Sequence, residues 1–125
     1  MDLYGPFDTD GALDWETYLR PHDDLSEVRK ALDAVETADW PYSWAAAELV
    51  ARLGGYPRGW FPEGIIEWMT TVEDQLTRDD VLHAYSIAEE LLLRDIASLW
   101  ADGDKWVVTV LDLRRRLRAL ATRWT

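Results

Sequence analysis

The last segment of the chain carries a strict helical repeat of apolar residues. The repeat consists of Trp106, Val110, Leu113, Leu117, Leu120 and Trp124, at alternating intervals of four and three residues. This spacing places all six side chains on one face of a helix, as a single apolar seam. The seam needs a second apolar surface, either inside the domain or on another copy of the chain. We expect packing inside the domain, because a chain of 125 residues needs all its apolar stripes for one core.

Helical signals also dominate the rest of the sequence. Apolar periodicity and helix-start or helix-stop residues predict further helices over residues 12–20, 24–35, 41–53, 62–72 and 79–100. Asp24 and Glu27 form a capping-box-like pair, and Glu48 and Arg52 form an i,i+4 pair in the favourable order. We therefore expect an all-α fold, a single compact bundle of about five to six helices that spans residues 1–125.

Charge is distributed unevenly along the sequence. All 24 acidic residues lie in residues 1–112, whereas residues 113–125 hold five arginines and no acid, and the formal net charge is −11. An acidic body repels phosphate backbones, so we expect no direct contact with nucleic acid. The same charge either favours a protein partner with a basic surface or serves solubility alone.

Several absences indicate a cytoplasmic protein without a membrane segment. No apolar run reaches the roughly 18 residues of a membrane span, and the first residues lack the regions of a signal peptide. Cysteine is absent, which excludes disulfides and thiolate metal sites. The many alanines and the excess of arginine over lysine suggest a bacterial source. We expect a monomer or a weak homodimer.

Carboxylates crowd the F-D-T-D-G segment at residues 7–11, before the first expected helix. Alternate acids before a glycine are typical of a calcium loop, but the EF-hand register would put a proline at its first ligand position and a threonine at its last. We therefore interpret Asp8 or Thr9 as a helix cap and Asp10 as a favourable charge for the helix dipole. A looser metal site built from Asp8, Asp10 and Asp14 is the alternative.

The sequence is rich in tryptophan, with eight in all. Six fall on or beside helical apolar stripes and are expected in the core: Trp15, Trp44, Trp68, Trp100, Trp106 and Trp124. Trp40 and Trp60 lie in connections, where aromatics either cover a core edge or, when rimmed by carboxylates, contact a basic partner. Our candidates for a partner-binding or structural motif are Phe7, Asp8, Asp10, Asp14, Trp15, Trp40 and Trp60.

The sequence offers few residues for catalysis. Its two histidines, His22 and His83, lie in a turn and on a polar helix face, and neither has a marked nucleophile beside it. Phosphate-binding, dinucleotide-binding and nucleophile-elbow motifs are absent. We therefore expect no enzymatic activity, no cofactor and no bound metal.

The motif at residues 7–15 resembles a known family. Its letters F-D-T-D-G-A-L-D-W are similar to the F-D-N-D-x-A-x-D-[WF] opening of a bacterial family of domains of unknown function, the one numbered forty-two fifty-nine. Residues 45–51, A-A-A-E-L-V-A, resemble the A-A-A-E-x-[VI]-A helix of that family. The resemblance implies a small domain of this fold and size, and it implies no particular activity.

These observations favour a small acidic cytoplasmic interaction protein that binds another protein, as an immunity protein, antitoxin or regulator does. Two alternatives stay open. One is an inhibitor that mimics DNA with rows of carboxylates, and the other is a metal-dependent hydrolase that uses the N-terminal aspartates and His22.

Overall fold

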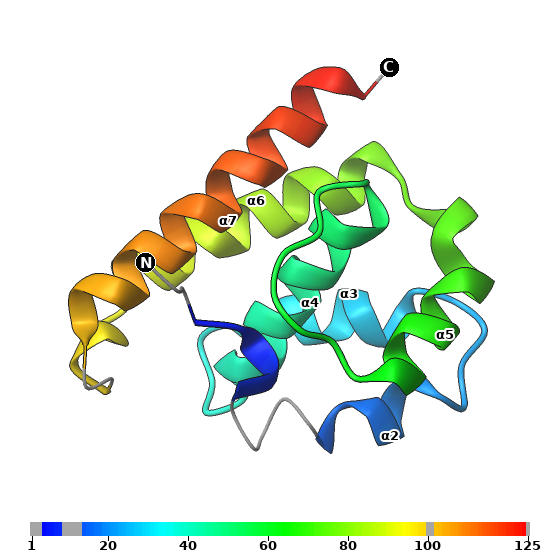
Figure 1. The fold of residues 1–125 in the computed structure, drawn as a ribbon, viewed down its shortest axis with the longest axis horizontal. Helices are drawn as coiled ribbons and strands as arrows, with labels where there is room; N and C mark the ends of the chain where they lie inside the picture. The colour runs from blue at the N-terminus through cyan, green and yellow to red at the C-terminus, as the bar shows by residue number, and fades with distance from the viewer. Residues whose placement is uncertain (1–3, 9–13, 100–101, 125) are drawn as a thin grey trace.

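The chain folds into helices joined by short connections (Figure 1). The computed structural model describes residues 4–8, 14–99 and 102–124, with the backbone alone at Asp8 and Ser98. In these ranges it contains no strand, and its elements are η1 (Pro6–Asp8), α2 (Glu16–Leu19), α3 (Ser26–Leu32), α4 (Trp40–Leu53), α5 (Glu63–Val72), η2 (Glu73–Gln75), α6 (Arg78–Leu93), η3 (Ala97–Leu99) and α7 (Gly103–Arg123). The expected all-α fold and helix number are confirmed.

The apolar seam of α7 packs within the domain. Figure 1 shows α6 and α7 side by side and antiparallel, with α4 beneath them. The seam residues Trp106, Val110, Leu113, Leu117 and Leu120 are all buried, and Trp124 packs against the core edge. The expectation of an internal seam is therefore confirmed.

Helix α4 forms the centre of the core. Small side chains at Ala45, Ala46 and Ala47 are fully buried, because α3, α6 and α7 all pack against this helix. Pro41 stands in the first turn and Gly54 follows the last residue, as the sequence predicts. On the α4 side facing α7, the Trp44 and Trp106 ring centroids lie 4.8 Å apart in an edge-to-face arrangement.

A buried ion pair joins α4 to α7. Arg116 donates two hydrogen bonds of 2.9 Å to the carboxylate of Glu48, and both residues are almost fully buried. Arg116 also donates to Asp112 at 2.8 Å, four residues earlier on the same helix. The predicted surface pair between Glu48 and Arg52 is wrong, because Glu48 faces inward and the Arg52 guanidinium lies over the ring of Phe61.

The predicted helix over residues 79–100 ends early, at Leu93. Arg94 leaves the helix with extended backbone angles, and its guanidinium donates a hydrogen bond to the carbonyl of Val35. The chain then turns into η3, which packs against α7. A tertiary contact therefore ends a helix that the local apolar pattern would continue.

Two helix starts differ in how they are capped. Thr77 and Asp80 form a complete capping box at the start of α6. The predicted capping box at Asp24 and Glu27 is wrong, because Asp24 accepts a hydrogen bond from the backbone N–H of Ser26 instead.

Among the helices of the described residues, none is both long and apolar enough to cross a membrane.

Candidate functional site

The structure separates the residues that the sequence singled out. Phe7 is buried against Phe61, with ring centroids 4.8 Å apart. Trp40 is half-buried against Trp106, and Trp60 is 63% exposed. Asp10 and the side chain of Asp8 lie outside the described residues. Of the described residues, Phe7 packs in the core and Trp60 faces solvent, so these two candidates do not share one site.

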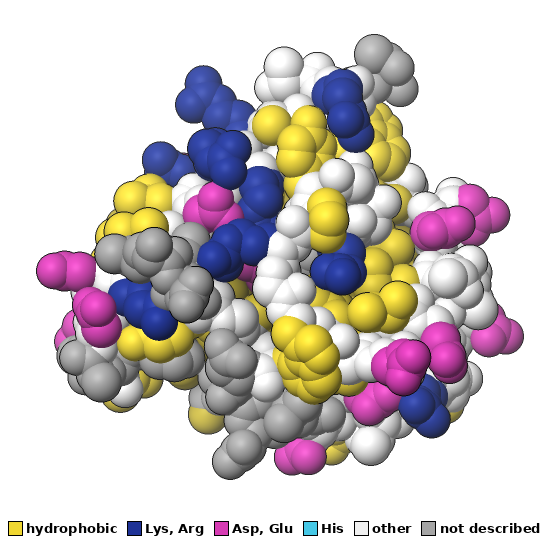
Figure 2. All heavy atoms as spheres, in the orientation of Figure 1, with side chains coloured by type: hydrophobic (Ala, Val, Ile, Leu, Met, Phe, Trp, Pro, Cys, Tyr) yellow, Lys and Arg dark blue, Asp and Glu magenta, His cyan; other side chains and the backbone are white. Residues whose placement is uncertain are grey.

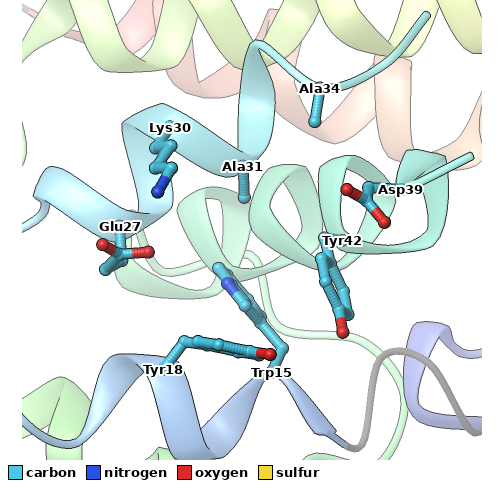
Figure 3. A pocket seen from close by; sticks show the side chains of 8 residues that line it. All are labelled: Trp15, Tyr18, Glu27, Lys30, Ala31, Ala34, Asp39 and Tyr42. Carbon is cyan, nitrogen blue, oxygen red and sulfur yellow. The ribbon is translucent and has the colours of Figure 1, made fainter. Parts of the chain in front are cut away.

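Trp15 lines one of the hollows in the described part of the molecule. A pocket of about 290 Å³ opens where α2, α3 and the start of α4 meet (Figure 3). We call it the aromatic pocket, and its lining residues are Trp15, Tyr18, Glu27, Lys30, Ala31, Ala34, Asp39 and Tyr42. In Figure 3, Trp15 and Tyr18 rise from the α2 side, while Glu27 and Lys30 come from α3.

The pocket combines a buried aromatic floor with an accessible aromatic rim. Trp15 is only 2% exposed, whereas Tyr18 is 55% exposed. The rings of Tyr18 and Tyr42 tilt toward each other at 58°, with centroids 6.3 Å apart. Their faces carry the negative side of the aromatic quadrupole, which attracts cations.

Carboxylates surround these rings. Asp39, the residue just before α4, lines the pocket without a capping hydrogen bond from its side chain. Burial, the neighbouring Tyr18 and the charges of Asp14 and Asp39 raise the pKa of Tyr42 above its ordinary value. Tyr42 is therefore a neutral phenol at neutral pH, and Asp14 lies close enough to share its electrostatic environment.

The other charged residues that line the pocket are Glu27 and Lys30. Glu27 faces His22, with 3.5 Å between Oε1 and Nε2. Within the described part of the chain, neither Lys30 nor the carboxylates of Asp14 and Asp39 form an ion pair. The pocket thus holds aromatic faces and a carboxylate whose hydrogen-bonding capacity is unused.

Asp14 is exposed. Its backbone carbonyl accepts a hydrogen bond from the Thr17 hydroxyl at 2.8 Å, which helps to start the short turn of α2. The carboxylate is therefore available to solvent, as expected for a contact residue and not for a buried structural acid.

A second hollow has the opposite charge. A groove of about 390 Å³ between α6 and α7 is lined by Arg78, Leu82, Tyr85, Arg118, Ala121 and Thr122. Figure 2 shows further Lys and Arg side chains gathered along α7, whereas many Asp and Glu side chains lie toward the end of the molecule where α5 lies and others lie at the opposite end. Cations are thus attracted to one region of the surface and anions to another.

The buried ion pair of Glu48 and Arg116 joins α4 to α7 and is enclosed by the protein. Burial raises the pKa of Glu48, and the hydrogen bonds from Arg116 oppose that rise. Arg116 also donates to the carbonyl of Tyr56, so the guanidinium is surrounded by acceptors of this chain. No solvent-facing atom is left for a substrate.

The described residues do not form a metal site. In residues 4–8, 14–99 and 102–124, no group of three or more His, Asp and Glu side chains comes together in a geometry that could hold a metal ion. His22 faces Glu27, and His83 faces Asp33 at 3.1 Å. The alternative metal site predicted at Asp8, Asp10 and Asp14 is not tested, because Asp10 and the side chain of Asp8 lie outside the described residues.

Sequence reasoning identified Trp15 but missed most of the pocket. Tyr18 and Tyr42 were not candidates, although Tyr18 lies off the apolar stripe of Trp15 and Leu19. An aromatic residue on the polar face of a helix was the available signal. Nothing in the sequence marked Lys30 and Asp39 as pocket residues, because charged residues of this kind occur all along the chain.

Comparisons with known protein families, with curated proteins and with solved structures gave no match. The resemblance of residues 7–15 to the family numbered forty-two fifty-nine therefore stays a prediction.

Proposed function

We propose that this protein acts by binding a partner protein with a basic surface, and that the aromatic pocket makes the central contact. The observation that carries the proposal is Asp39, a carboxylate without an ion pair among the described residues, which lines the same pocket as the rings of Tyr18 and Tyr42. Aromatic residues that are partly exposed and close to opposite charge are typical interface anchors.

The biological class that we propose is a small cytoplasmic immunity, antitoxin or regulatory protein. The support is its acidic charge and the helical body, in which the ionisable groups buried most deeply serve the fold. Such a protein needs a specific surface and no reaction centre.

Affinity capture from the native host tests the proposal when it is performed with matched variants. The wild-type chain should retain a stoichiometric partner, and Asp14→Asn/Asp39→Asn should retain several-fold less. Retention should also fall as the salt concentration rises, because the contact is electrostatic.

The control is Glu90→Gln/Asp104→Asn, which removes the same charge from exposed positions outside the pocket. This variant should capture the partner as the wild type does. Equal loss in both variants would show that only net charge matters, and capture of no partner by the wild type would contradict the proposal.

The two alternative functions are an inhibitor that mimics DNA and a metal-dependent hydrolase. An inhibitor that mimics DNA needs a continuous acidic face, and the arginines along α7 interrupt the surface seen in Figure 2. A metal-dependent hydrolase would rest on Asp8, Asp10 and Asp14, with His22 as a further candidate, and metal analysis of the purified protein tests it.

A further inference from the structure

The size of the aromatic pocket suits one side chain. Its volume of about 290 Å³ lies just below the range of about 300–1,000 Å³ found for small-ligand sites. The exposed Tyr18 at the rim leaves the pocket open to a group that projects from another surface. A whole helix or a nucleotide would need a longer groove.

The chemistry of the pocket selects a cation that is flat and rich in donors. A guanidinium stacks on a tyrosine face and still donates several hydrogen bonds in its plane. A lysine ammonium is more strongly hydrated, and a quaternary ammonium has no hydrogen to donate to Asp39. The combination of aromatic faces and an unused carboxylate therefore favours arginine.

We propose that the aromatic pocket takes one arginine side chain of the partner, with its guanidinium against Tyr18 and Tyr42 and hydrogen-bonded to Asp39. Asp14 adds a second negative charge near the site. This inference rests on the proposed function and names the residue that the partner inserts.

The positive charge of Lys30 repels an arginine side chain in the pocket. Its removal can therefore test whether the pocket binds a cation or an anion. Its ammonium lies on α3 at the pocket wall and points into the hollow in Figure 3. Removing this charge in Lys30→Met should tighten the binding of an arginine. If the pocket instead took an anion, the same substitution would weaken binding.

The experiment is an NMR titration of the full ¹⁵N-labelled chain with a capped pentapeptide of four alanines and a central arginine. Matched peptides carry lysine or citrulline, the neutral isostere of arginine, at the centre. We expect the indole N–H of Trp15 to shift in a saturable way with the arginine peptide, several-fold more weakly with lysine, and not with citrulline.

Variants at exposed positions locate the site. Asp39→Asn should raise the Kd about fivefold, which corresponds to loss of one exposed charge interaction, and Tyr18→Leu should raise it as well. Lys30→Met should lower the Kd, and Glu90→Gln should leave it unchanged. The groove between α6 and α7 should show no shifts.

Three results would overturn the inference: equal shifts with citrulline, an Asp39→Asn variant that binds as Glu90→Gln does, or weaker binding by Lys30→Met. If the wild-type protein captures a partner but fails this titration, the arginine assignment falls and the interaction function stands. If the peptide binds but the host supplies no partner, the proposed function falls alone.

Discussion

Gly54 follows α4 at a point where its backbone approaches a side chain of α7. A Cβ atom added at this position would overlap the side chain of Leu120, which is itself buried. Gly54→Ala should therefore lower the free energy of unfolding by about 1–3 kcal/mol, the usual cost of an overpacked core. Urea unfolding followed by circular dichroism measures this change.

Gly64 in α5 is the matched control. A Cβ there would meet the tips of Glu16 and Arg20, which can swing into solvent. Because alanine is the better helix former, Gly64→Ala should leave stability unchanged or raise it by up to about 1 kcal/mol. Equal destabilisation by the two substitutions would contradict the packing described at Gly54.

Asp80 links the start of α6 to α3. Burial alone would raise its pKa, but hydrogen bonds from Arg29 and from Thr77 outweigh burial and hold the pKa below its ordinary value. Asp80→Asn should lower the free energy of unfolding at pH 7 by about 1 kcal/mol, as the loss of a cap and a half-exposed ion pair does.

The sign of the Asp80 effect with pH follows from its depressed pKa. The native state favours the ionised carboxylate, so the stabilisation is complete above the unfolded-state pKa of about 4. It is lost as the pH falls below that value through the native pKa. Unfolding curves from about pH 7 to about pH 2.5 should therefore converge for wild type and Asp80→Asn at the acid end. A constant difference would contradict this account.

At the scale of the helices, the contact between α4 and α7 depends on a pair of buried charges. Arg116→Met leaves the carboxylate of Glu48 buried without its partner, so it should lower the free energy of unfolding by about 3–5 kcal/mol. Arg115→Met removes a neighbouring arginine whose side chain is 71% exposed, and it should change stability by less than about 1 kcal/mol.

A double variant separates the charge from the packing. Glu48→Met/Arg116→Met removes both charges and should recover much of the stability lost in Arg116→Met. Chemical unfolding of the single and double variants measures the coupling between the two sites. Equal costs for Arg116→Met and Arg115→Met would show that the pair carries no special role.

Local patterns in the sequence predicted the helices better than their contacts. The α7 seam was predictable because every residue in it repeats the same spacing along one helix face. The end of α6 at Leu93 was not, because it depends on a hydrogen bond from Arg94 to Val35, far away in the sequence. The partner of Glu48 was missed for the same reason, since the favourable neighbour Arg52 is only four residues away.

The aromatic pocket could be predicted only in part. Trp15 was a candidate because it belongs to the motif at residues 7–15. The other pocket residues come from three helical segments that meet only in the folded chain. Tyr18 and Tyr42 are separated by a full helix and its connections, and neither belongs to an apolar stripe. Which surface aromatics meet is decided by helix packing, which a single sequence does not specify.

At the scale of the whole molecule, the formal charge of −11 works against compaction. Raising the salt concentration from about 0.02 M to about 0.5 M shortens the screening length from roughly 20 Å to roughly 4 Å. We therefore expect the thermal midpoint at pH 7 to rise with salt, as measured by circular dichroism. The charge-reversal variant Glu36→Lys/Glu67→Lys should respond less, and a midpoint that falls with salt would contradict net repulsion.

The buried pair of Glu48 and Arg116 also limits how the molecule can open. If α7 detached while α4 stayed folded, the carboxylate of Glu48 would lose both hydrogen bonds from the Arg116 guanidinium at once. We therefore expect this half-open state to be costly, and we expect backbone amides of α4 and α7 to exchange with solvent mainly through one shared opening event. We therefore expect the two helices to behave as a single cooperative unit, although α5 and α6 lie between them in the sequence.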